Sequence, residues 1–66
     1  MTITLNGQKQ TVPGSATILD LLANLGFGGR PVVVELNRQA LLPREHASVP
    51  VNEGDVIEVV QITAGG

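Results

Sequence analysis

The 66-residue sequence contains no cysteine, tryptophan or tyrosine, and it has one phenylalanine and one histidine. Without cysteine the chain cannot form a disulfide, a thiolate zinc site or a cysteine nucleophile. A single imidazole with no cysteine beside it argues against a metal site, so we expect none. We expect the one histidine, His46, to pack on the surface or within a loop.

Basic residues are few, because four lysines and arginines stand against six acids, for a formal net charge of -2. This balance gives no electrostatic reason to expect a polyphosphate ligand and disfavours nucleic-acid binding. No apolar run approaches the roughly 20 residues that span a bilayer, and residues 1–5 lack the basic start of a signal peptide. We therefore expect a cytoplasmic protein without a membrane segment.

The chain is rich in isoleucine, leucine and valine, which recur from Ile3 to Ile62. A chain of this length buries only about 60% of its unfolded surface, which allows one hydrophobic core. We therefore expect one domain at residues 1–62 with an aliphatic core, followed by a flexible tail at residues 63–66.

The first twelve residues have the pattern of a β-hairpin. Apolar residues alternate with polar ones over residues 1–5, which is the period of a strand with one buried face. Asn6-Gly7 follows, and this dipeptide suits the positive φ angles of a tight turn. Residues 8–12 should therefore return antiparallel to residues 1–5.

Thr17 and Asp20 have the spacing of a capping box, which predicts a helix beginning at this point. The expected helix ends near Gly26, a plausible C-cap. Five residues fall on one stripe of a 3.6-residue helix and are predicted to face the core: Ile18, Leu19, Leu21, Leu22 and Leu25.

The second half of the chain is predicted to supply three further strands. β-Branched residues dominate at 32–36, and Asn37-Arg38 marks a turn into a short segment at 39–42. Residues 44–51 should be irregular or form a brief 3₁₀ turn. Residues 56–62 form the most apolar run and should lie centrally in the sheet.

This element order favours an α+β fold with two layers. One helix would cover one face of a mixed sheet of four to five strands. The first and last strands can lie parallel in the middle, because the intervening helix and loops provide a long enough crossover.

The sequence resembles the ubiquitin-like β-grasp family, and specifically sulfur carriers of the ThiS type. The resemblance covers the whole chain and rests on its length and on four short segments. These are Glu35-Leu36-Asn37, Leu42-Pro43-Arg44, the Gly54-Asp55 turn before an apolar strand, and Ala64-Gly65-Gly66.

The resemblance implies that the chain is a carried cosubstrate and not an enzyme. An adenylating, ThiF-like partner would consume ATP to activate the carboxylate of Gly66, next to Ala64 and Gly65 in the tail. Sulfur from a donor protein would then replace the adenylate. The thiocarboxylate would be delivered to thiazole synthase in thiamin biosynthesis, with no cofactor bound by the carrier itself.

The residues of the tail also suit this chemistry when they are considered without the family. A terminal carboxylate is an anion at neutral pH and a poor electrophile, so it needs activation. Gly65 and Gly66 lack a Cβ and can pass through a narrow channel. Residues 63–66 reach at most about 13–14 Å when extended, which is enough to enter a partner's active site.

Strand parity predicts a partner-binding face. If Ile57 and Val59 face the helix, Val56, Glu58, Val60 and Ile62 lie on the other face. This face is too apolar for plain solvent exposure, and Val33 could extend it into a binding patch. Arg44 either contacts solvent or a carbonyl group, or helps to dock the activating enzyme.

Three other functions remain open at this point. The small subunit of molybdopterin synthase shares the fold and the Gly-Gly end, although the brevity of the chain favours the thiamin type. A β-grasp RNA-binding module is opposed by the acidic balance and the scarcity of aromatics. A ubiquitin-like protein conjugated to lysines would show isopeptide-linked products.

Overall fold

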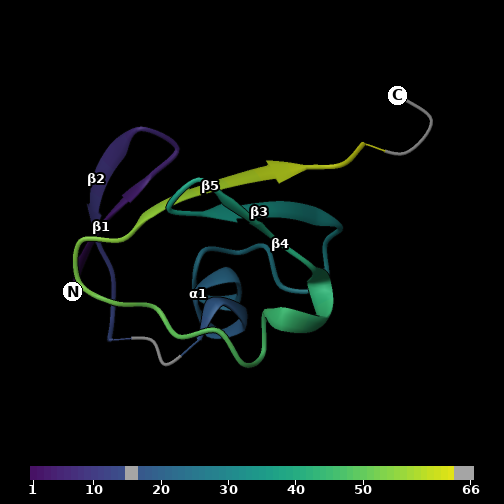
Figure 1. Cartoon of the computed structure of the whole chain (residues 1–66), viewed down its shortest axis with the longest axis horizontal. Coiled ribbons are helices and arrows are strands. Elements are labelled where there is room, and N and C mark those ends of the chain that lie inside the picture. The colour runs from purple at the N-terminus through teal and green to yellow at the C-terminus, as the bar shows by residue number, and fades with distance from the viewer. Residues whose placement is uncertain (15–16, 64–66) are drawn as a thin grey trace.

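The computed structural model describes residues 1–14 and 17–63 (Figure 1). It contains five strands, one α-helix and one 3₁₀ turn in these residues. In chain order they are β1 (Thr2–Leu5), β2 (Gln8–Thr11), α1 (Ile18–Asn24), β3 (Val32–Leu36), β4 (Gln39–Leu41), η1 (Pro43–Glu45) and β5 (Val56–Gln61).

The five strands form one mixed sheet in the order β2-β1-β5-β3-β4. The last strand, β5, is central, parallel to β1 and antiparallel to β3. Helix α1 covers one face of this sheet (Figure 1). The arrangement confirms the predicted α+β class, the two layers of the β-grasp fold and the parallel pairing of the first and last strands.

The N-terminal hairpin forms where the Asn6-Gly7 dipeptide predicts it. Asn6 has a φ of 49° and Gly7 a φ of 82°, the left-handed conformation that a two-residue hairpin turn requires. Thr2 then pairs with Thr11, and Leu5 with Gln8. The register places Ile3 in the core, as the alternation of residues 1–5 predicts.

Helix α1 begins with the predicted capping box. The backbone N–H of Asp20 donates to Thr17 Oγ1 at 3.2 Å, and that of Thr17 donates to Asp20 Oδ2 at 3.3 Å. The helix ends at Asn24, and its C-cap is Leu25 instead of the predicted Gly26, which follows with a φ of 88°. This left-handed position after the cap favours glycine.

One member of the predicted helical stripe does not belong to the core. Ile18, Leu21 and Leu22 are buried, whereas Leu19 is 50% exposed. At 3.6 residues per turn Leu19 lies about 100° around the helix from Ile18, at the margin of the apolar stripe. The prediction that Leu19 faces the core is therefore wrong.

The core lies between α1 and the face of the sheet that it covers. Its buried side chains are aliphatic and come from the helix, three strands and two loop positions. They are Ile3, Val12, Ile18, Leu21, Leu22, Val32, Val34, Val51, Ile57 and Val59. No helix within residues 1–14 and 17–63 is long and apolar enough to cross a membrane.

Two asparagine side chains extend the pairing of the central strand. Asn6 accepts the N–H of Val59 at 2.8 Å and donates to its carbonyl oxygen at 3.2 Å. Asn37 accepts the N–H of Val56 at 2.9 Å. Both asparagines lie in turns with positive φ, which this residue type tolerates. The two turns therefore also fix the position of β5.

Candidate functional site

The base of the predicted tail is held at the end of β5. The N–H of Ile62 donates to the carbonyl oxygen of Pro31 at 3.0 Å, and Arg30 Nη1 donates to Gln61 Oε1 at 3.4 Å. The chain thus remains hydrogen-bonded up to Ile62. Three of the four residues of the predicted tail, Ala64, Gly65 and Gly66, lie outside the described residues.

Three of the predicted partner-binding residues lie together on the outer face, which is the face of the sheet turned away from α1. Val33 and Val60 are in register on β3 and β5, and they are 45% and 59% exposed. Glu58 lies on β5 two residues before Val60 and on the same face. The burial of Ile57 and Val59 agrees with the parity on which this face was predicted.

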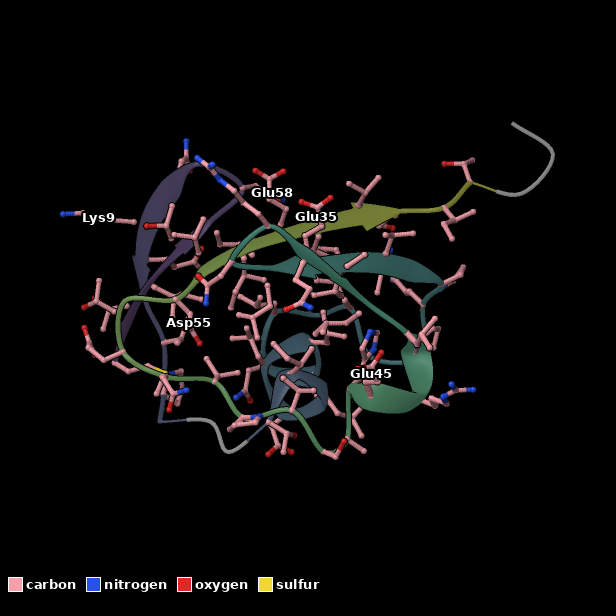
Figure 2. All side chains as sticks on the ribbon, in the orientation of Figure 1. Lys9, Glu35, Glu45, Asp55 and Glu58 are labelled. Carbon is pink, nitrogen blue, oxygen red and sulfur yellow. The ribbon has the colours of Figure 1, made fainter. Side chains whose placement is uncertain are left out.

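Glu35 also belongs to the outer face, although the sequence analysis did not select it. It lies directly opposite Glu58 in the pairing of β3 with β5. Figure 2 shows both glutamates pointing away from the side where α1 packs. Strand parity relative to Val33 was the signal that could have identified Glu35.

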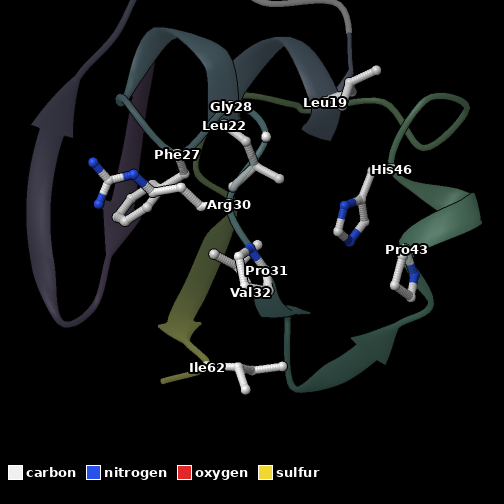
Figure 3. A pocket seen from close by; sticks show the side chains of 11 residues that line it. Leu19, Leu22, Phe27, Gly28, Arg30, Pro31, Val32, Pro43, His46 and Ile62 are labelled. Atoms are coloured by element: carbon white, nitrogen blue, oxygen red, sulfur yellow. The ribbon is translucent and has the colours of Figure 1, made fainter. Parts of the chain in front are cut away.

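Ile62 and Arg44 lie apart from these residues. Ile62 follows the end of β5 and lines a hollow together with Leu22, Pro43 and His46 (Figure 3). Arg44 is exposed on η1, next to the Pro43 side chain that lines the same hollow. These two residues therefore border the helix side of the molecule instead of extending the outer face.

His46 is buried directly after η1, so of the two expectations packing on the surface is wrong and packing within a loop holds. Only 6% of the residue is exposed, and its ring lines the hollow, whose volume is about 220 Å³. Its carbonyl oxygen accepts the N–H of Leu19 at 2.8 Å, which fixes it against the start of α1. Its Nε2 is buried without a hydrogen-bond partner in the described part of the chain. A lone histidine in a polar loop gave no signal of this burial.

Replacing His46 by phenylalanine is expected to stabilise the domain by about 1–2 kcal/mol. The substitution removes a buried polar atom that has no partner, and the adjacent hollow accommodates the larger ring. The thermal midpoint, followed by circular dichroism, should rise by about 4–8 °C for each kcal/mol. His46→Ala is the control and should lower the midpoint through cavity formation, and a lower midpoint in His46→Phe would contradict the assignment.

The described residues include no group of three histidine, cysteine, aspartate or glutamate side chains that could hold a metal ion. The features that remain are an exposed apolar and acidic face on β3 and β5 and a hydrogen-bonded strand that leads into the last residues. Such an arrangement can present a chain end to another protein.

The model of the ThiS family matches residues 3–66. The chain belongs to the ThiS family. It is 37% identical over 62 residues to the "Sulfur carrier protein ThiS" of Thermus thermophilus, covering 94% of this chain and 95% of that protein. A crystal structure of the thiamine biosynthesis protein ThiS from Geobacter metallireducens matches with a TM-score of 0.84 and 32% identity, over the full length of both chains. The likeness confirms the fold.

Two larger relatives contain a segment similar to this ThiS family chain. They are the thiazole synthases of Paramagnetospirillum magneticum and Magnetococcus marinus, each 36% identical over 66 residues. The match covers all of this chain but 20% of each thiazole synthase. The chain therefore spans about a fifth of the length of these two relatives.

Proposed function

We propose that this protein carries sulfur for thiazole formation in thiamin biosynthesis. The observation that supports this most directly is the family match, which continues through Gly66, the residue whose carboxylate would be modified. The similarity to a sulfur carrier protein over nearly its whole length supports the same function. The chain then acts as a cosubstrate and not as an enzyme.

The proposed reaction begins at the carboxylate of Gly66. An adenylating partner joins this carboxylate to AMP from ATP and releases pyrophosphate, which turns a poor electrophile into an acyl adenylate. Hydrosulfide released by a donor protein attacks the acyl carbon, the new C–S bond forms as the C–O bond to AMP breaks, and the S–H proton is lost to solvent. The resulting thiocarboxylate carries the sulfur to thiazole synthase. ATP is consumed by the partner, so the carrier itself needs no cofactor.

The fold suits this role because it separates recognition from chemistry. Strand β5 is paired on both sides and fixes the start of the tail, whereas Val33 and Val60 remain exposed on the outer face. A partner can bind this face while the last residues enter its active site. The carrier-like segment in two thiazole synthases supports thiazole synthase as the acceptor of the sulfur.

The function is tested by the mass of the C-terminal peptide of protein isolated from its own cells. We expect a fraction in which one oxygen of the Gly66 carboxyl is replaced by sulfur. The change must be located in the C-terminal fragment, because oxidation of Met1 alters the intact mass by nearly the same amount. Reconstitution with ATP, the adenylating partner and a sulfur donor should restore the modification. A C-terminal peptide that remains unmodified in both experiments would refute the proposal.

Val60→Asp is expected to leave the domain folded and to weaken its binding to the adenylating partner by about ten-fold or more. Val60 is largely exposed in the free protein, so a carboxylate there stays hydrated until a partner covers it. The KM for the carrier in ATP–pyrophosphate exchange measures the effect. Gln8→Asp, which adds the same charge on the edge strand β2, is the control. Equal KM values for both variants would exclude Val60 from the interface.

A further inference from the structure

Four of the six acidic residues have a structural task in the fold. Their carboxylates accept backbone N–H groups at a helix start, at η1, before a turn or at the first residue of β1, and such bonds satisfy amides that would otherwise lack partners. These four are Asp20, Glu45, Glu53 and Asp55, with N–H to oxygen distances of 3.3, 2.9, 2.9 and 2.8 Å.

The other two acids, Glu35 and Glu58, have no such task. Neither carboxylate forms a hydrogen bond or an ion pair with any residue in the ranges 1–14 and 17–63. They are nevertheless direct cross-strand neighbours on β3 and β5. Cβ atoms of such pairs lie about 4.5–5.5 Å apart, and like charges at this distance destabilise a sheet. The fold itself therefore gains nothing from this pair.

No lysine or arginine of the described strands offsets the two charges. Lys9 is on the edge strand β2, separated from β5 by β1. Figure 2 shows its side chain at the far end of the sheet from both glutamates. Arg38 lies in the turn that joins β3 to β4, and among the described residues it forms no ion pair with either glutamate. Both carboxylates therefore remain available to a cation of a partner.

The acidic pair adjoins an apolar pair on the same face. Val33 and Val60 are opposite each other, two residues along the strands from Glu35 and Glu58. We call these four residues the outer patch. Two exposed valines beside two uncompensated carboxylates match a partner surface that has apolar side chains around a cation.

We propose that the outer patch docks an arginine of the adenylating enzyme between Glu35 and Glu58, with apolar neighbours of that arginine packed on Val33 and Val60. A guanidinium presents several N–H donors in one plane, so it can bind both carboxylates, and it loses its water more readily than an ammonium group. This inference rests on the proposed function, because it assumes a partner that activates Gly66.

The adenylating enzyme is the favoured partner because of the charge it must bear. An enzyme that binds ATP beside the tail needs cationic groups around the phosphates. Strand β5 runs from the outer patch towards the tail, and the six residues after Val60 reach about 20–22 Å at most. The outer patch can therefore bind the surface of the same enzyme whose active site receives the tail. Attraction between the two carboxylates and the cationic groups of the enzyme would also accelerate the association of the two proteins.

The test compares the parent with the double variant Glu35→Gln/Glu58→Gln in ATP–pyrophosphate exchange. Glutamine keeps the shape of the side chain and removes the charge. We expect the KM for the carrier to rise about ten-fold at low ionic strength with kcat unchanged, because the lost charges act in docking. The KM of the parent should rise with salt, whereas that of the variant should change little. The thermal midpoint of the variant should equal or exceed that of the parent.

The matched control is Asp20→Asn/Glu53→Gln, which removes the same two charges elsewhere and keeps an oxygen acceptor at each position. Its KM should stay within about two-fold of the parental value, which excludes an effect of net charge alone.

Each other outcome overturns a defined part of the inference. If the parent is adenylated and the Glu35→Gln/Glu58→Gln variant has the parental KM, the docking role is wrong and the proposed function stands. A raised KM for thiazole synthase alone would overturn the choice of partner. A parent without any ATP-dependent exchange would overturn the proposed function together with this inference.

Discussion

Deletion of Gly66 should abolish thiocarboxylate formation and leave the stability of the domain nearly unchanged. In the proposed reaction the acyl carbon that reacts belongs to this residue, so its removal ends the chain about 3.3–3.6 Å short of the activating site. Gly66 has no side chain, so its deletion takes no side chain out of the hydrophobic core. The C-terminal peptide mass after reconstitution with ATP, the adenylating partner and a sulfur donor measures the loss.

Adding one alanine after Gly66 makes the chain one residue too long, and this variant should also fail to form the thiocarboxylate. The carboxylate then lies about 3.3–3.6 Å too far along the chain, and it follows a residue with a Cβ that a narrow channel would reject. Both variants should unfold at the parental thermal midpoint. Sulfur transfer to either chain end at the parental rate would remove the specific role of Gly66.

The turns and the helix start could be predicted from the sequence because their determinants are local. A capping box needs only Thr17 and Asp20, and a two-residue hairpin turn needs only Asn6 and Gly7. The central position of β5 could also be predicted from its apolar run, although only the face with Ile57 and Val59 is buried. These features need no knowledge of which residues meet across the sheet.

Features that depend on register and packing could not be predicted. The cross-strand position of Glu35 opposite Glu58 follows from the pairing of β3 with β5, which the sequence does not display. The bonds from Asn6 and Asn37 to β5 join residues 53 and 19 positions apart. The burial of His46 depends on how η1 packs against α1, and no periodicity marks it.

For the same reason, only some residues of the candidate site were predicted to lie where the structure places them. Period-two alternation identified the outer face with Val33, Glu58 and Val60, because parity along one strand suffices for this. Ile62 was assigned to that face by parity, yet it lies past the end of β5, where strand geometry no longer applies. Arg44 had no periodic context, and the structure places it on η1.

Leu21→Ala is expected to lower the free energy of unfolding by about 2–5 kcal/mol. Leu21 is fully buried between α1 and the sheet, and truncation removes apolar contacts and leaves a cavity. A domain of this length has a total stability of about 3–10 kcal/mol, so the variant should retain little of it or unfold. Alanine is the better helix former, so the loss would report packing and not helix propensity.

Leu19→Ala is the matched control, because it makes the same substitution two residues away in the same helix. Leu19 is half-exposed at the margin of the stripe, and its truncation should cost less than about 1 kcal/mol. Urea unfolding must be followed by far-ultraviolet circular dichroism, since the chain has no tryptophan or tyrosine to serve as a fluorophore. Equal losses in the two variants would mean that α1 is rotated from the orientation that buries Leu21, and the helix face would then have to be reassigned.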